Sequence, residues 1–390
     1  MRLIPRLAIT WALGTASTCW GQLYLITGSP TPKYNERYGV ALLRVDEEGA
    51  VRASEIVSAK TGTEWIATSQ EGGKALILPA YPDDTVSVVD FGKAAVVKQC
   101  SMPGTLNVSL IEQWLMDLPG RGLSYVEFLA GDDQGNQTLR GMSMDPSIPC
   151  ERSFFPVTPD QLRYVVADGR AGVADMGSRD GIGVRIDSAG QLRRRNQGFD
   201  VAFDLVVPKE LRLDIGNPSA GIVCNNSELL ALSTYRGTGE KLLVLRQRDQ
   251  TWHVVPIPSE KLTWLRAFGK YLVISEAWTN SPLHKESAGR SAWRKKPGSY
   301  GPGTEERLRE SKAVFPGRLH LFNVDTEKML TIETKQADSE VLLIDRNVVY
   351  YRADTRLFSA EITDGGIANA RVVAEGEEIR DAHWAFLRRQ

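Results

Sequence analysis

Residues 63–99 read TEWIATSQEGGKALILPAYPDDTVSVVDFGKAAVVKQ and contain four short apolar runs separated by turn residues. The runs are Trp65–Thr68, Lys74–Ala80, Thr85–Asp90 and Ala94–Gln99. Short runs rich in Val, Ile and Leu, bounded by Gly, Pro and Asp, predict strands rather than helices. The tight turns between them predict one four-stranded antiparallel sheet, in which Val86 and Val88 alternate with Ser87.

The same grouping recurs along the chain with little sequence identity. Residues 219–256, 262–334 and 340–374 each contain four such runs, whereas residues 152–196 and 105–150 are less regular. A small sheet of this kind cannot bury both of its faces alone, so copies of it must stack on one another. The chain is therefore predicted to be an all-β repeat protein.

The two ends of the chain complete this pattern. Three strands are expected at Gln22–Thr27, Gly39–Asp46 and Ala50–Ser58, and a single strand at Glu378–Arg388. Pairing of that last strand with the first three yields one more sheet and leaves no open sheet edge at the chain ends. The innermost strands then begin near residues 65, 108, 154, 220, 262, 340 and 379.

Those starting points have a mean spacing of about 52 residues, close to the roughly 40–50 residues of known propeller repeats. The prediction is a β-propeller of seven four-stranded blades, formed by residues 22–390 as one domain and closed by pairing of the N- and C-terminal strands.

Two stretches resemble a known repeat family. Ser69–Leu78 (SQEGGKALIL) followed by Asp84–Asp90 (DTVSVVD) resembles the YVTN-type propeller repeat, which reads roughly S-P-D-G-K-x-L-Y-V and then N-T-V-S-V-I-D. Leu319–Thr334 resembles the second half of that repeat. The chain departs from the pattern where Gln70 replaces Pro and an extra Gly73 is present. The resemblance implies a secreted or surface seven-bladed propeller, in some members lactonase-like.

The N-terminus is typical of a secretory signal peptide. Arg2 and Arg6 precede a short apolar run, Leu7–Ala16, that ends in small residues. Cleavage is expected after Gly21, which gives a secreted or periplasmic protein. A lipid anchor on Cys19 and a retained, buried first strand are the alternatives. No later stretch reaches the ~18 apolar residues of a membrane helix.

The balance of charges narrows the classes of partner. The chain has 47 basic and 48 acidic residues and a net charge of −1, so composition indicates no attraction to nucleic acid or anionic lipid.

Without the signal peptide, three cysteines remain, which allows one disulfide and one free thiol in an oxidising compartment. The pairing among Cys100, Cys150 and Cys224 stays open, and none of them has the spacing of a metal site.

Long connections are expected to gather on one face of the propeller. Gly28–Tyr38, Asp168–Gly181 and Trp278–Gly317 are assigned to second-to-third strand loops, whereas tight turns such as Glu47–Gly49 fall on the opposite face. Loops held by a rigid scaffold carry function more often than the scaffold does. The longest insertion, residues 279–317, has more basic than acidic residues, which is typical of a solvated loop or of a contact for an anionic partner.

Aromatic residues recur at the end of the second strand of several repeats. The candidate ligand-binding residues on the long-loop face are Tyr81, Tyr235, Trp278, Tyr351 and His383. Tyr and Trp offer large amphipathic contact surfaces, and His383 lies on the expected innermost closing strand. The alternative is structural: the aromatics cover the upper rim of the core, and His383 is a hydrogen-bonded core residue.

No motif of a zinc protease, a serine hydrolase or a nucleotide-binding loop is present in the sequence. We therefore expect no catalytic residue, no metal and no cofactor. The favoured hypothesis is a monomeric, non-catalytic module that binds a protein, peptide or glycan. The alternative is a hydrolase resembling propeller lactonases, with a site at the channel mouth.

Overall fold

A computed structural model describes most of the chain, and most of the described residues lie in β-strands. The described residues are 22–28, 39–58, 63–69, 73–79, 85–101, 112–118, 122–129, 138–156, 182–186, 188–196, 199–212, 221–225, 228–234, 241–246, 248–256, 264–275, 317–334, 336, 339–380 and 382–388. The expected all-β chain of small antiparallel sheets is confirmed. The signal-peptide prediction lies outside these residues.

Strands from the two ends of the chain share one sheet. Its order is β27-β1-β2-β3, formed by Ala382–Arg388, Gln22–Gly28, Gly39–Val45 and Val51–Ser58. β1 pairs antiparallel with both neighbours, so that Leu25 lies opposite Leu43 on one side and opposite Ala385 on the other. Leu25 and Trp384 therefore belong to one sheet, and neither is more than 2% exposed.

Four more four-stranded sheets are present among the described residues. Their strands are β4 (Thr63–Ser69), β5 (Lys74–Pro79), β6 (Thr85–Asp90) and β7 (Ala95–Ser101); β8 (Glu112–Leu118), β9 (Gly122–Leu129), β10 (Thr138–Ser143) and β11 (Phe154–Pro156); β19 (Trp264–Phe268), β20 (Tyr271–Ser275), β21 (Arg318–Asn323) and β22 (Lys328–Glu333); β23 (Ser339–Asp345), β24 (Val348–Ala353), β25 (Arg356–Thr363) and β26 (Gly366–Glu375).

The remaining strands join into one seven-stranded sheet of order β14-β13-β12-β15-β16-β17-β18. Its strands are Ile182–Ile186 (β12), Gln191–Asn196 (β13), Phe199–Val206 (β14), Gly221–Asn225 (β15), Leu229–Thr234 (β16), Lys241–Arg246 (β17) and Thr251–Pro256 (β18). β12 and β15 connect its two parts, with Gly183 opposite Ile222. Three short helical segments complete the described elements: α1 (Cys150–Ser153), α3 (Lys209–Arg212) and the 3₁₀ turn η5 (Glu377–Ile379).

The expectation of an innermost strand near residue 154 is wrong. Phe154–Pro156 is β11, the edge strand that pairs with β10. Pro156 explains this position, because proline has no N–H to donate to a second neighbour and is found mainly at sheet edges. Asp168–Gly181, which the sequence places between the second and third strands of a blade, falls between β11 and β12 and lies outside the described residues.

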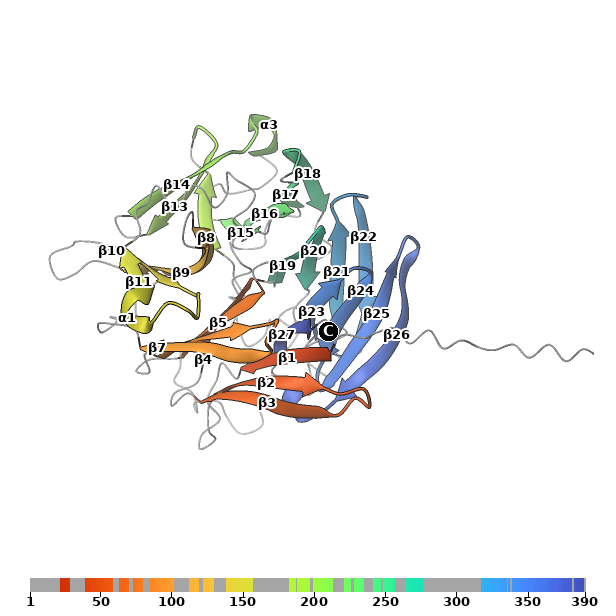
Figure 1. Cartoon of the computed structure of the whole chain (residues 1–390). Coiled ribbons are helices and arrows are strands. Elements are labelled where there is room, and N and C mark those ends of the chain that lie inside the picture. The colour runs from red at the N-terminus through yellow and green to blue at the C-terminus, as the bar shows by residue number, and fades with distance from the viewer. Residues whose placement is uncertain are drawn as a thin grey trace, which may run out of the picture.

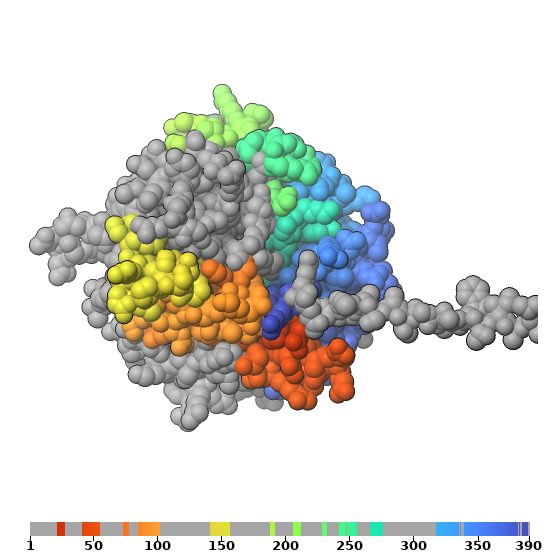
Figure 2. Space-filling model, in the orientation of Figure 1, coloured from red at the N-terminus to blue at the C-terminus, as the bar shows by residue number. Residues whose placement is uncertain are grey.

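The sheets are arranged radially around a common centre (Figure 1). The chain colour runs once around the molecule, and the blue strand β27 lies beside the red strand β1. Figure 2 shows the same juxtaposition on the molecular surface, where the last strand touches the first sheet. This radial stacking of antiparallel sheets is of the β-propeller type.

The hydrophobic core lies between the faces of neighbouring sheets. One apolar cluster joins Leu23 and Leu25 of the first sheet to Leu342, Leu343 and other residues of the β23–β26 sheet. Strands in the middle of a sheet are consequently buried on both faces, as the burial of all five residues of β20 shows. For this reason the expected alternation in β6 is wrong: Ser87 is as buried as Val86 and Val88, at 0% exposed.

The first and last sheets also meet backbone to backbone. Gly49, in the turn between β2 and β3, has a φ of +83°, and a Cβ built on it falls 2.6 Å from the carbonyl oxygen of Val373 in β26. A side chain at this position would therefore meet main-chain atoms that cannot move away easily.

Tight turns between third and fourth strands share one kind of hydrogen bond, from a main-chain N–H group of the turn to an Asp or Asn side chain. The Asp46 carboxylate accepts hydrogen bonds from the Glu48 and Ala50 N–H groups at 3.1 and 2.7 Å, and the Asp90 carboxylate accepts one from Lys93 N–H at 3.0 Å. Asp and Asn favour turns because their side chains bond the main chain a few residues on. Three further Asx side chains make the same kind of bond, those of Asp145, Asp249 and Asn323.

One disulfide links two neighbouring sheets. Cys100, near the end of β7, is bonded to Cys150, the first residue of α1. This resolves the cysteine pairing that the sequence left open. Within the part of the chain that the structure describes, no helix has the length and apolar character required to cross a membrane.

Candidate functional site

The residues predicted to bind a ligand are only partly described. Tyr81, Tyr235 and Trp278 lie outside the described residues. His383 lies on β27 where the pairing with β1 shifts: Ile26 is opposite Trp384 and Thr27 is opposite Ala382, so His383 occupies the extra position of a β-bulge. Bulges are found frequently beside functional sites because they change the direction of a side chain.

Tyr351 is buried in the core between two sheets. Its side chain is 5% exposed and stacks on Phe358, with ring centroids 5.1 Å apart and planes 8° from parallel. Desolvation raises the pKa of the Tyr351 hydroxyl. The Tyr351 ring is therefore packed in the core, and little of it is exposed.

Four side chains from three sheets meet near the innermost strands, and we call them the inner-strand cluster: Arg266 of β19, Glu340 of β23, Arg352 of β24 and Trp384 of β27. Glu340 lies between the two guanidinium groups. Its Oε1 is 3.2 Å from Arg266 Nη1, and its Oε2 accepts a hydrogen bond of 3.0 Å from Arg352 Nη2.

Main-chain and aromatic contacts fix both arginines in place. Arg266 Nη1 donates to the Val341 carbonyl at 2.9 Å, and its guanidinium carbon lies 4.5 Å from the centroid of the Trp384 ring. Arg352 Nε donates to the carbonyl of Ala382 at 2.7 Å. Guanidinium groups are suited to such sites because they stack on aromatic rings and donate in a rigid fork.

The inner-strand cluster is buried and ties three sheets together. The side chains of Arg266, Glu340 and Arg352 are 6%, 4% and 3% exposed. Burying charges is unfavourable unless they are paired and hydrogen-bonded, so this arrangement depends on all of its members. It connects β19, the β23–β24 hairpin and β27, and therefore fixes the relative positions of inner strands near the predicted channel.

Sequence reasoning did not single out Arg266, Glu340 or Arg352. A usable signal was present, because Arg266 interrupts the apolar run Trp264–Phe268 and Glu340 directly precedes Val341–Ile344. A charged residue inside a buried strand requires a partner. The sequence does not say which of the distant charged residues is that partner.

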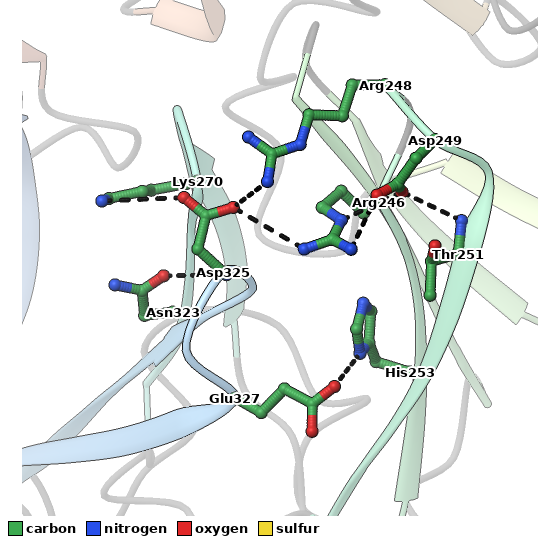
Figure 3. Close-up of polar contacts among 9 residues, drawn as sticks. All are labelled: Arg246, Arg248, Asp249, Thr251, His253, Lys270, Asn323, Asp325 and Glu327. Carbon is green, nitrogen blue, oxygen red and sulfur yellow. Dashed lines mark hydrogen bonds and ion pairs between the residues drawn. The ribbon is translucent and has the colours of Figure 1, made fainter.

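A second group of polar residues bridges the β15–β18 and β19–β22 strands (Figure 3). We call it the seam network: Arg246, Arg248, Asp249, Thr251, His253, Lys270, Asn323, Asp325 and Glu327. Asp325 is at its centre, with Arg248 Nη2 at 2.8 Å, Lys270 Nζ at 3.7 Å and Arg246 Nη1 at 3.8 Å. Alongside, His253 Nδ1 lies 2.7 Å from Glu327 Oε1.

Arg246 and Asp249 form a two-point ion pair within this network. Arg246 donates from Nε to Asp249 Oδ1 at 3.0 Å, and its Nη2 lies 2.7 Å from Asp249 Oδ2. The hydrogen bond from Arg246 and those from Thr251 lower the pKa of Asp249 to about 2, while the same carboxylate raises the pKa of Arg246. The two-point contact keeps Asp249 ionised in moderately acidic solution.

Replacing Asp249 with Asn is expected to remove a pH-dependent part of the stability. A carboxylate whose folded pKa is depressed stabilises the fold above its unfolded pKa, about 3.9, and this contribution is lost as the pH falls towards 2. The difference in urea midpoint between wild type and Asp249→Asn should be constant above pH 5 and shrink between pH 4 and pH 2. The exposed turn variant Asp364→Asn serves as a control, and a gap that stays unchanged down to pH 2 would contradict the assignment.

No group of three or more His, Cys, Asp or Glu side chains arranged to hold a metal ion is present among the described residues. The residues brought together are instead two arginines, one glutamate and a tryptophan in the inner-strand cluster, and alternating charges in the seam network. Both sets join one sheet to another.

No protein-family model and no curated protein matches the chain. Solved structures resemble it at low identity. Hsv2p of Kluyveromyces lactis is 11% identical with a TM-score of 0.42, the match covering 91% of this chain and 95% of that one. AztD of Citrobacter koseri is 6% identical with a TM-score of 0.40, covering 94% and 97%. TolB of Acinetobacter baumannii is 9% identical with a TM-score of 0.35, covering 94% of this chain and 66% of TolB. Similarity at this level carries no argument about ligand or activity.

Proposed function

We propose that this protein is an exported β-propeller of seven blades that binds a protein, peptide or glycan through the face carrying its long connections. In this proposal the scaffold is rigid and the loops provide recognition, without catalysis. The observation that carries the proposal is the unequal length of the strand connections on the two faces.

Consecutive antiparallel strands connect alternately at the two faces of a radial stack. On one face the second strand connects to the third through residues 29–38, 80–84, 130–137, 235–240 and 276–317. On the opposite face third strands connect to fourth strands through residues 46–50, 91–94, 247–250, 324–327 and 364–365. Residues 144–153, which contain α1, are an exception on that face, and 354–355 are a short connection on the loop-bearing face. Long loops on one face of a rigid scaffold are typical of a binding surface.

The strand pattern supports seven blades. Five four-stranded sheets and one seven-stranded sheet are described, and seven strands correspond to one complete blade, β15–β18, plus three strands of another. The pairing of β1 with β27 supports closure of the ring by both chain ends. Because strands from both chain ends form one sheet, closure of this kind leaves neither the first strand nor the last strand of the chain unpaired.

The strand positions also support the resemblance to YVTN-type repeats. The residues that resemble the repeat form adjacent strands, with Leu76 of β5 opposite Val88 of β6. In the second stretch, Leu319 of β21 is opposite Ile332 of β22. The resemblance therefore falls on a repeated structural unit, although its residues belong to the core and turns rather than to a site.

The disulfide supports export. Disulfides persist in oxidising compartments and are rare in reducing ones. A bond between Cys100 and Cys150 fits the signal-peptide pattern of residues 1–21 and supports the proposal that the mature chain lies in the periplasm or outside the cell.

Deleting part of the longest connection tests the proposed binding face. A variant in which residues 281–313 are replaced by a short Gly-Ser linker should keep the thermal unfolding midpoint of the wild type. Its binding to immobilised peptide and glycan arrays should fall by about tenfold or more for the probes that the wild type captures. A matched variant on the opposite face, Glu47→Lys/Glu48→Lys, changes two exposed turn residues and should bind as the wild type does. Equal binding by the wild type and the loop variant would reject this loop as the recognition element.

A further inference from the structure

The outer edge of the β8–β11 sheet is made of unusually short elements. β11 has 3 residues and pairs with β10 at only three positions, from Arg140 opposite Pro156 to Met142 opposite Phe154. α1, which precedes it, has 4 residues and no side-chain cap at its N-terminus. Elements this short contribute little local stability, so what holds them to the rest of the protein decides whether they stay in place.

The residues just before this edge are held by two lysines of the neighbouring sheet. Lys98 Nζ on β7 donates to the carbonyls of Ser143 and Asp145 at 2.9 and 2.8 Å, and Lys74 Nζ on β5 lies 3.5 Å from the carbonyl of Met144. Lys98 is 8% exposed, and desolvation lowers its pKa. Met142 and Met144, both 0% exposed, pack against Leu76, Val86 and Val88 in one shared apolar cluster.

The residues after Asp145 are anchored differently. The Ser153 hydroxyl bonds only locally among the described contacts, to the carbonyls of Ile148 and Pro149. The Phe154 side chain packs against the same apolar cluster, and the Cys100–Cys150 disulfide is the covalent link from this segment to the neighbouring sheet. Cys100 is 2% exposed, whereas Cys150 is partly exposed, so Cys150 is the more accessible of the two bonded cysteines.

We propose that the Cys100–Cys150 disulfide is a redox-controlled lock on residues 146–156: a dithiol reductant releases α1 and β11 from the β4–β7 sheet while the rest of the propeller stays folded. One thiolate of the dithiol attacks Cys150 Sγ, forms a mixed disulfide and displaces Cys100 as a thiolate, which takes up a proton. The second thiol of the reagent then displaces Cys150 and leaves as a cyclic disulfide. Two electrons pass to the protein, and two protons end on its cysteines.

The lock has a defined boundary. Lys98 and Lys74 remain bound to the carbonyls of residues 143–145 after reduction, because they do not depend on the disulfide. Opening therefore begins after Asp145 and uncovers the outer edge of β10, whose main-chain groups then face solvent. An uncovered strand edge is a template for pairing with another strand.

Hydrogen exchange of the full-length protein with and without dithiothreitol tests the lock. Reduction should speed amide exchange in residues 146–156, and in the β10 amides that pair with β11, by about tenfold or more. Exchange in residues 85–90 and 271–275 should stay unchanged, because β6 and β20 belong to buried parts of other sheets.

The double variant Cys100→Ser/Cys150→Ser should reproduce the fast exchange without reductant and should show no further change when reductant is added. This second arm also removes any effect of reductant on Cys224. Unchanged exchange in residues 146–156 after complete reduction, measured by thiol labelling of Cys100 and Cys150, would overturn the proposal. Equal acceleration in residues 85–90 would also overturn it, since it would mean global rather than local opening.

Discussion

Removing the C-terminal strand β27 is expected to abolish cooperative folding. Truncation after Arg380 deletes Trp384 and Phe386, which are 2% and 4% exposed, together with Ala382 and Ala385 at 0% and 1%. Loss of one large buried aromatic side chain reduces the free energy of unfolding by about 3–5 kcal/mol, and a whole domain has only about 5–15 kcal/mol. The truncated chain should show no sigmoidal thermal transition by circular dichroism.

The deletion also removes the inner neighbour of β1, so its effect should be reversible by supplying that strand. A synthetic peptide of residues 381–390, added in excess to the truncated chain, should restore a cooperative transition whose midpoint rises with peptide concentration. The matched control is the same peptide with Trp384→Ser and Phe386→Ser, which keeps the main chain but not the buried surface. A truncated chain that unfolds at the wild-type temperature would contradict the proposed closure by both chain ends.

The sequence was sufficient to predict the elements that depend on local patterns. The runs of Val, Ile and Leu between turn residues located most strands, and the missing partner at each end of the chain predicted that β27 would join β1. These inferences work because strand periodicity and turn chemistry are local properties. The expectation that the strand containing Leu25 pairs with the C-terminal strand rests on counting strands rather than on any similarity between the two segments, and the register that sets Leu25 opposite Ala385 comes from the structure.

Inferences that required knowledge of neighbouring sheets were less successful. The alternating pattern predicts Ser87 on the face of β6 opposite Val86 and Val88, but both faces of β6 are covered and Ser87 is buried. The sequence predicts an inner strand near residue 154, where the structure has the edge strand Phe154–Pro156, because an apolar triplet carries no information on its place in a sheet. Contacts such as Arg266 with Glu340 join distant parts of the chain, and no local pattern specifies them.

Glu340→Gln is expected to lower the free energy of unfolding by about 3–5 kcal/mol. Its carboxylate is 4% exposed and lies between the guanidinium groups of Arg266 and Arg352, so removing its charge leaves two buried cations without this shared counter-ion. Removing one partner of a buried ion pair commonly has an effect of this size, because the remaining charge stays desolvated. Urea unfolding of wild type and variant at pH 7, monitored by tryptophan fluorescence, measures the difference.

Two comparison variants separate the loss of the buried charge from other effects. Glu333→Gln removes an exposed carboxylate, 75% exposed and 3.7 Å from Arg318, and should change stability by about 0–1 kcal/mol. The triple variant Arg266→Leu/Glu340→Leu/Arg352→Leu removes all three buried charges and should lose less stability than Glu340→Gln, since apolar residues of similar volume leave no uncompensated ion. If Glu340→Gln and Glu333→Gln had equal effects, the inner-strand cluster would not hold β19, the β23–β24 hairpin and β27 together, and the burial of its charges would need another explanation.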